Sequence, residues 1–443
     1  MSSSALFATA LLLPLGWLGV YALLLLAQVR VREAFPVVGL KAVVGILFLI
    51  YGWLALAGES IALALPRWLW IPRVYEFPLE LSFTPALGAA GLAMLLIVAV
   101  LVKYSETYLH KELGFHRFFF LFGVFVGAFP LVVFADNIDV LFVGWELIGL
   151  TSVLLIGFYE HRPRPAVHSW WAMSTYRFCD VGLLAGTAIA HYAAHTSNIT
   201  LLNRPAELAL AHPEHAGWLG ALALLIFFAS LGKAAQLPFT SWIARAMEGP
   251  TPSSALYYGA LSVGLGPILL LKFQPLLLHF PWMQALIIGV GASSALYAYL
   301  VSKTRSDAKG ILAYSAVFEV SLMVVEVGLG LHDWVIFHFV ANAFLRVFQF
   351  LRSMNAIHDF YENPLFFRGA PHHPAPWLVR RLPRALQRRL YHRAMNGFGL
   401  DWFWLNVVVR PWLAMWRNLN SLENALALGE RRRERAPITE EDA

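Results

Sequence analysis

Long apolar runs separated by short polar segments dominate this chain. About 20 consecutive apolar residues are what an α-helix needs to cross the hydrocarbon core of a bilayer. The pattern predicts an all-α polytopic membrane protein with eleven spans, at about residues 5–27, 37–57, 84–104, 117–135, 138–158, 168–192, 216–237, 252–273, 282–302, 309–330 and 333–353.

The basic residues between the spans predict the orientation, because connections rich in Lys and Arg stay in the cytoplasm. Connections after even-numbered spans carry only Arg67, Arg73 and Arg204. Those after odd-numbered spans carry Arg30, Arg32, Lys103, Lys111, Arg117, Arg162, Arg164, Arg245, Lys303, Arg305 and Lys309. We therefore expect an integral protein of a bacterial inner membrane, with its N-terminus outside and its C-terminus in the cytoplasm.

Two longer connections and a basic C-terminal region complete the pattern. Residues 58–83 are rich in Pro and aromatic side chains and predict an ordered extramembrane hairpin, whereas residues 193–215 predict a polar loop. The Trp-rich segment 401–417 is too short to span and predicts an interfacial helix, followed by a charged tail. The adjacent histidines His372 and His373 fit a solvated loop better than a metal site.

Composition narrows the chemistry. The chain is 59% hydrophobic and 14% charged, and its net charge of +6 lies in loops and the tail, so it indicates no nucleic-acid partner. The single cysteine, Cys179, excludes an internal disulfide and a Cys-ligated iron–sulfur or zinc site. Only His338 lies deep in a span, which argues against bis-histidine haem. We expect no cofactor, no metal and no catalytic site of its own.

The seventh apolar run ends in a segment that predicts a broken helix. Lys233, Gln236 and Pro238 fall at membrane depth in the sequence Leu-Gly-Lys-Ala-Ala-Gln-Leu-Pro-Phe. Pro interrupts the helix, and the freed backbone groups must be satisfied by protein or by water in a cavity. The segment therefore indicates a buried titratable lysine. The alternative is that Lys233 and Pro238 mark the end of the span, with the lysine reaching to the interface.

Carboxylates occur in two neighbouring spans. Glu146 lies in the middle of the fifth span and needs a cation or a proton there. Arg177 and Asp180 are three residues apart in the sixth span and can pair within one helix. The alternatives to a role in proton movement are that Glu146 is a protonated structural residue and that Arg177 and Asp180 form a purely structural ion pair.

The last two spans carry further polar residues. Glu319 and Glu326 are seven residues apart, so they share one face of the tenth span. His338, Asn342 and Arg346 recur every fourth residue along the eleventh span and form one polar stripe. Such a stripe can be a helix–helix contact. Together with Glu146, Asp180 and Lys233, the stripe predicts a proton path through the membrane. Lys309 at the start of the tenth span and Tyr258 in the eighth are further candidates for this path, although interior tyrosines usually just satisfy a partner.

Ordered motifs in this chain resemble the antiporter-like, proton-pumping subunits of respiratory complex I, most of all subunit L. The same family contains the large subunit of Mrp-type antiporters and the membrane subunit of DAB inorganic-carbon complexes. The motifs are Trp-Glu-Leu-Ile-Gly-Leu from Trp145, Arg-Phe-Cys-Asp from Arg177, Gly-Lys-Ala-Ala-Gln-Leu-Pro-Phe from Gly232, Met-Glu-Gly-Pro-Thr-Pro-Ser-Ser-Ala-Leu from Met247 and Asp-Ala-Lys-Gly-Ile-Leu-Ala-Tyr-Ser from Asp307.

The resemblance implies two inverted five-helix repeats, each with one broken helix. It implies that Glu146 is the family's essential glutamate and that Lys233 is the lysine whose proton affinity this glutamate controls. Asp180 resembles an acid that modulates the pair, and Lys309 and His338 resemble members of the central hydrophilic axis. The expected units are residues 1–83, a first repeat at 84–275, a partial second repeat at 276–353 and a basic region at 354–443.

This chain also departs from the family pattern. Tyr258 and Asn342 stand where the family has histidines, and Arg346 stands for a lysine and cannot pass a proton on. Glu319 and Glu326 are not part of the family motif. The second repeat ends after three helices. The resemblance therefore does not establish whether this chain contains an exit for the proton.

Two functions follow as hypotheses. The first is a proton-conducting subunit, with sodium as the alternative ion, that works with a peripheral or soluble energy-coupling partner, either a complex I-like redox arm or a DAB-type carbon-hydrating subunit. The second is a structural or assembly subunit that no longer pumps.

Overall fold

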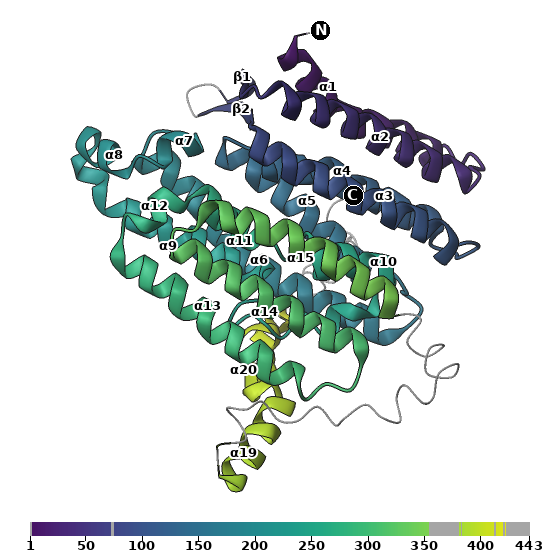
Figure 1. Ribbon diagram of the computed structural model, residues 1–443, viewed down its shortest axis with the longest axis vertical. Helices are drawn as coiled ribbons and strands as arrows, with labels where there is room; N and C mark the ends of the chain where they lie inside the picture. Colours follow the sequence, from purple (N-terminus) through teal and green to yellow (C-terminus); the bar gives the residue numbers. More distant parts are fainter. Residues whose placement is uncertain are drawn as a thin grey trace, which may run out of the picture.

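The computed structural model describes residues 2–71, 75–353, 381, 383–411, 413–419 and 421. Its long helices run side by side in one bundle, with α1 and α2 forming an outer layer (Figure 1). They are α1 (Ser3–Leu26), α2 (Ala34–Ala57), α3 (Pro85–Tyr108), α4 (Phe115–Val133), α5 (Ile138–Ile156), α6 (Pro163–Ala193), α9 (Ala216–Lys233), α13 (Pro281–Ser302), α14 (Ala308–Gly328) and α15 (His332–Ser353).

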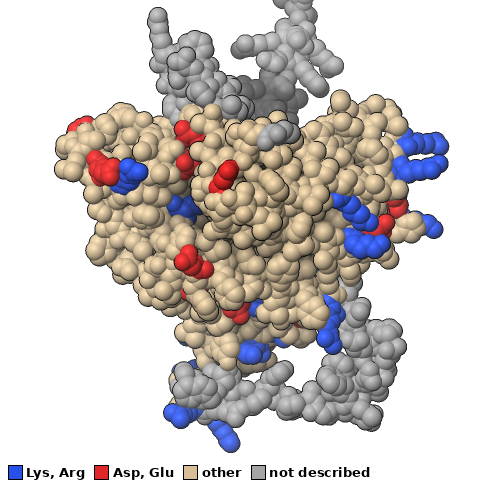
Figure 2. All heavy atoms as spheres, turned by 45° about the horizontal axis from the view of Figure 1, so that its top comes forward, with Lys and Arg blue, Asp and Glu red and all other residues tan. Residues whose placement is uncertain are grey.

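The expected all-α membrane architecture is confirmed. In the described part of the chain, ten segments are helical, long and apolar enough to cross a membrane. The expected span at 168–192 lies in α6, which is 31 residues long but is not among these ten. Its Arg177 and Asp180 lower its hydropathy, and α6 packs between α5 and α9. Figure 2 shows a broad uncharged surface, with most Lys and Arg side chains toward its margins.

A two-stranded antiparallel sheet marks one end of the bundle, called the hairpin end below. Strands β1 (Ile61–Ile71) and β2 (Tyr75–Phe83) pair there as the expected hairpin. The expected polar loop at 193–215 is partly helical, because Asn198 caps α7 and Pro205 begins α8. The short elements at this end are α7 (Ile199–Leu202), α8 (Pro205–Ala211), η1 (Pro213–His215) and α12 (Gln274–Leu278) (Figure 1).

The expected span at 252–273 is not one regular helix. It consists of α10 (Thr251–Ser253), the π-helical turn η3 (Ser254–Ala260) and α11 (Leu265–Lys272). A Cβ on Gly264 would lie 2.4 Å from the Phe339 ring, so glycine here lets α15 approach the interruption closely. Most π-helical turns are single insertions and are frequent at functional sites.

The C-terminal helices pack against the flank of the bundle. They are α19 (Arg384–Met395), η4 (Gly397–Gly399), α20 (Leu400–Trp404) and η5 (Leu405–Val409). Trp404 is buried edge-on against Phe178 and Phe239, and Asp401 accepts two hydrogen bonds from Arg245 at 3.0 and 3.1 Å. The predicted interfacial segment is thus fixed to the bundle. His372, His373 and the tail at 430–443 lie outside the described residues.

Candidate functional site: a buried lysine and a bridging arginine

The broken helix is present and ends at the lysine itself. Helix α9 stops at Lys233, and the chain continues as turns to η2 (Arg245–Glu248). The freed carbonyls find donors: Ala234 N bonds Ser230 O at 3.0 Å, and Trp242 Nε1 bonds Gly232 O at 3.0 Å. Protein groups therefore satisfy the interrupted backbone, as a broken helix at membrane depth requires.

Lys233 is buried rather than extended to an interface. Only 1% of the residue is exposed, and its amine donates a 2.5 Å hydrogen bond to the carbonyl oxygen of Trp145. The amine also lies 4.3 Å from the Trp145 ring centroid and 5.6 Å from that of Tyr176. No carboxylate among the described residues lies within 4.0 Å of this amine. The aromatic faces and one carbonyl therefore provide its direct contacts.

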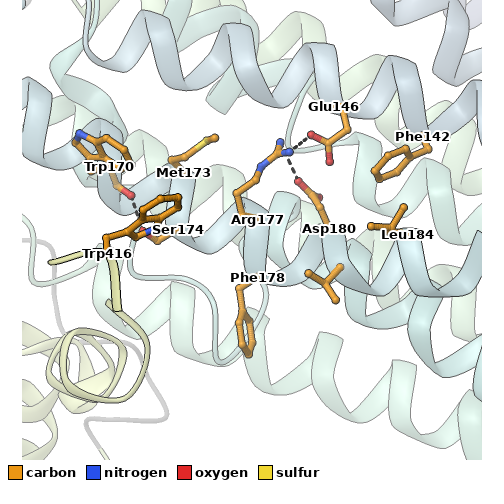
Figure 3. A pocket seen from close by; sticks show the side chains of 11 residues that line it. Phe142, Glu146, Trp170, Met173, Ser174, Arg177, Phe178, Asp180, Leu184 and Trp416 are labelled. Atoms are coloured by element: carbon orange, nitrogen blue, oxygen red, sulfur yellow. Dashed lines mark hydrogen bonds and ion pairs between the residues drawn. The ribbon is translucent and has the colours of Figure 1, made fainter. Parts of the chain in front are cut away.

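Arg177 bridges the two carboxylates of the site. Its guanidinium forms an ion pair with Glu146 from α5 and a second one, at 3.4 Å, with Asp180 on its own helix (Figure 3). Asp180 also accepts a 2.6 Å hydrogen bond from Trp145 Nε1. The predicted pairing of Arg177 and Asp180 is confirmed, and Glu146 contacts this arginine instead of Lys233.

Gly149 lies close to both cations of the site. A Cβ on Gly149 would lie 3.2 Å from the Lys233 amine and 3.7 Å from Arg177 Nη2. Both cations therefore border one small space, one helical turn from Glu146 on α5.

The proton path predicted from the sequence implies that Gly149→Ala lowers proton flux several-fold while the protein still assembles. The added methyl group would crowd the Lys233 amine, and overpacking costs about 1–3 kcal/mol. The measurement is flux into vesicles at matched protein levels. Gly289→Ala is the control, because a Cβ there meets nothing within 4 Å. Equal flux in the two variants would show that the space beside Gly149 is not part of the predicted proton path.

A cavity of about 610 Å³ opens beside the bridged carboxylates. Its wall is mainly apolar, with Glu146, Arg177 and Asp180 as its charged residues. Trp416 of the C-terminal segment lines it from the side opposite Glu146 (Figure 3). Sequence reasoning did not place Trp416 here, since no local spacing relates it to α5 or α6.

Hydroxyl groups extend from the lysine toward the interrupted span. Tyr258 in η3 has its OH 3.1 Å from Ser152 Oγ, and the same Oγ lies 3.3 Å from the OH of Tyr176 beside Lys233. The neighbouring Gly259 packs against α15, where a Cβ would lie 3.5 Å from Arg346 Cβ. The element η3 therefore contacts α15 through Gly259, while its Tyr258 hydroxyl points to Ser152 near the lysine.

The stripe forms a second polar cluster with α14. His338 Nδ1 lies 2.9 Å from Glu326 Oε1, and its Nε2 lies 3.3 Å from Glu319 Oε2. Arg346 lies 3.5 Å from Glu319 and also bonds Asn342 and the Ser315 carbonyl. The structure thus joins four predicted residues into one chain of contacts.

Lys309 lies apart from this cluster. It is in the first turn of α14, with its amine 3.4 Å from Met247 O and 3.5 Å from Gly249 O. Ten residues separate it from Glu319, which is about 15 Å along a helix. Lys309, which was predicted to lie on a central axis, is therefore nearer the end of the bundle opposite the hairpin than Glu319 is.

The fold and the site define an integral membrane protein with a helix that ends at a buried lysine beside a carboxylate–arginine cluster. The chain belongs to the family described as NADH:quinone oxidoreductase/Mrp antiporter, TM, whose model matches residues 135–366, a little over half of the chain.

Two relatives and one solved structure are similar to this chain. The chain is 33% identical to NADH-quinone oxidoreductase subunit L of Escherichia coli over 66% of this chain and 48% of that protein. It is 32% identical to chloroplastic NAD(P)H-quinone oxidoreductase subunit 5 of Physcomitrium patens over 66% of this chain and 41% of that protein. A chain in the Mrp complex from Dietzia matches with a TM-score of 0.69 and 27% identity over 80% of this chain and 38% of its own. The chain thus spans less than half the length of these relatives.

Proposed function

We propose that this chain is the proton-conducting membrane subunit of a larger energy-coupling complex. The observation that carries the proposal is the Lys233 amine, buried at the end of a broken helix and bonded to the backbone of the residue before Glu146. A buried cation at membrane depth costs several kcal/mol and is rarely kept without a role in ion movement. The motifs shared with the matched family support the same function.

The arrangement provides a means of control. Glu146 pairs with Arg177, and a Cβ on Gly149 would lie within 4 Å of both Arg177 Nη2 and the Lys233 amine. A partner subunit that moves Glu146 from the arginine toward the lysine changes how firmly the amine holds its proton, since a nearby opposite charge favours the charged form. Asp180 compensates the positive charge of Arg177 in both positions of the Glu146 side chain.

The proposed path uses the residues singled out in the sequence. Protons reach Lys233 next to Glu146 and continue past the Tyr258 hydroxyl to the cluster on α14 and α15. Arg346 is a fixed charge beside this path and does not itself transfer a proton. The path residues are Glu146, Asp180, Lys233, Tyr258, Glu319, Glu326 and His338. Arg346 lies beside them as a fixed charge, and Lys309 lies toward the end opposite the hairpin. The hairpin end faces outward, as the basic loops at the other end favour.

Glu146→Gln tests the proposal directly. The amide cannot attract the lysine proton by charge, so partner-driven flux into inverted vesicles is expected to fall strongly at unchanged complex level. Glu33→Gln, at the N-cap of α2 and outside the path, is the matched control. Flux measured with and without sodium identifies the ion. Unchanged flux in Glu146→Gln would reject the proposal.

The partner distinguishes the forms of this function. Affinity purification of the chain from native membranes, with mass spectrometry of the co-eluting proteins, identifies this partner. Iron–sulfur or flavin proteins indicate a complex I-like redox assembly, and one large soluble zinc protein indicates a DAB-type complex that hydrates carbon dioxide.

A structural subunit is the second candidate. Arg346, a fixed charge with four partners in the α14–α15 cluster, favours it, because such a network can serve to hold two helices together. This candidate predicts that Glu146→Gln changes neither growth nor flux, while deletion of residues 354–443 abolishes complex formation.

A further inference from the structure

Three ionisable groups lead from mid-membrane to the hairpin end along α14 and α15. Glu326 is two residues from the last residue of α14, whereas Glu319 is nine residues from it. At 1.5 Å per residue, these positions lie about 3 Å and 14 Å below the end of the helix. His338 from α15 lies between the two glutamates.

Each ring nitrogen of His338 faces a different carboxylate. Nδ1 lies 2.9 and 3.1 Å from the two oxygens of Glu326, and Nε2 lies 3.3 Å from Glu319. A neutral imidazole has one donor and one acceptor nitrogen, so it can accept a proton on one side and release one on the other. A purely structural ion pair would need only one of these contacts.

Charge balance leaves this cluster with one transferable proton. Its members are two carboxylates, the fixed cation of Arg346 and one imidazole. The guanidinium compensates one negative charge, and a net charge in hydrocarbon is unfavourable. One proton shared among Glu319, His338 and Glu326 makes the cluster neutral.

We propose that Glu319, His338 and Glu326 are the proton outlet of this chain at the hairpin end. This inference rests on the proposed proton-conducting function and assigns an exit within the chain itself. The proton of the Glu319 carboxyl moves to Nε2, and the Nδ1 proton moves to the Glu326 carboxylate. Glu326 then releases its proton to water at the end of α14. Rotation of the ring, or proton exchange with water, restores the Nδ1–H form for the next proton.

The test compares Glu326→Gln, His338→Gln and His332→Gln in vesicles that contain the native complex. Glu326→Gln and His338→Gln are expected to lower flux by at least about tenfold at unchanged complex level, since each removes one acid–base group. Glu326→Asp should restore part of the flux. His332→Gln, on the same helix and at the hairpin end, should leave flux unchanged.

Infrared difference spectra separate transfer from a structural role. A carboxyl band that appears on acidification should be lost in Glu326→Gln and kept in His332→Gln. The outlet is rejected if Glu326→Gln and His338→Gln both retain flux while Lys233→Ala loses it. If Lys233→Ala also retains flux, the proposed function itself fails.

Discussion

Lys233→Ala is expected to lower partner-driven proton flux by about 100-fold or more while the complex still assembles, because one positioned acid–base group contributes 10²–10⁴-fold. The amine is the only titratable group of the broken-helix segment Leu231–Trp242. Its removal leaves the Trp145 carbonyl without this donor and the path without its buried proton carrier. The measurement is the initial rate of acidification in inverted vesicles, with the complex quantified in the same membranes.

Lys233→Arg is the matched variant for this result. Arginine keeps the charge that Trp145 and Tyr176 surround, but it does not give up its proton in proteins. We therefore expect Lys233→Arg to assemble like the wild type and to conduct as poorly as Lys233→Ala. Substantial flux through Lys233→Arg would show that the site supplies only positive charge and that protons take another route.

The spans and the broken helix could be predicted from the sequence. Both depend on a local signal: an apolar run of membrane length, or a charge and a proline within such a run. Lys233 and Pro238 provided this signal, and helix α9 does end at the lysine. The polar stripe of α15 was predictable for the same reason, since spacing of four residues fixes one face of a single helix.

The partners across helices could not be predicted in this way. Spacing shows that Arg177 can reach Asp180, but it does not show that Glu146 on another helix shares the same guanidinium. The π-helical turn before Leu261 is likewise set by contact with α15, where Phe339 and Phe350 press against glycines of the eighth span. Such features depend on tertiary packing, which propensity and periodicity do not encode.

Among the single substitutions named above, Arg177→Ala is expected to cause the largest loss of stability, about 3 kcal/mol. Removing one partner of a buried ion pair costs about 3–5 kcal/mol. We take the lower end of this range because a third of the arginine side chain remains accessible. The change leaves Glu146 and Asp180 as two like charges without their shared cation. Thermal unfolding of the detergent-solubilised complex, followed by tryptophan fluorescence, measures the loss.

A second substitution separates lost charge compensation from lost packing. Glu146→Gln combined with Arg177→Ala leaves Asp180 as the one carboxylate of the Glu146–Arg177–Asp180 cluster, and Asp180 retains its hydrogen bond from Trp145. The double variant should therefore regain much of the stability that Arg177→Ala loses, and a double-mutant cycle gives the coupling energy. If the two losses simply add, Arg177 stabilises the helices by packing alone. In that case Glu146 has no electrostatic reason to remain with the arginine, and the proposed movement of Glu146 between Arg177 and Lys233 loses its starting position.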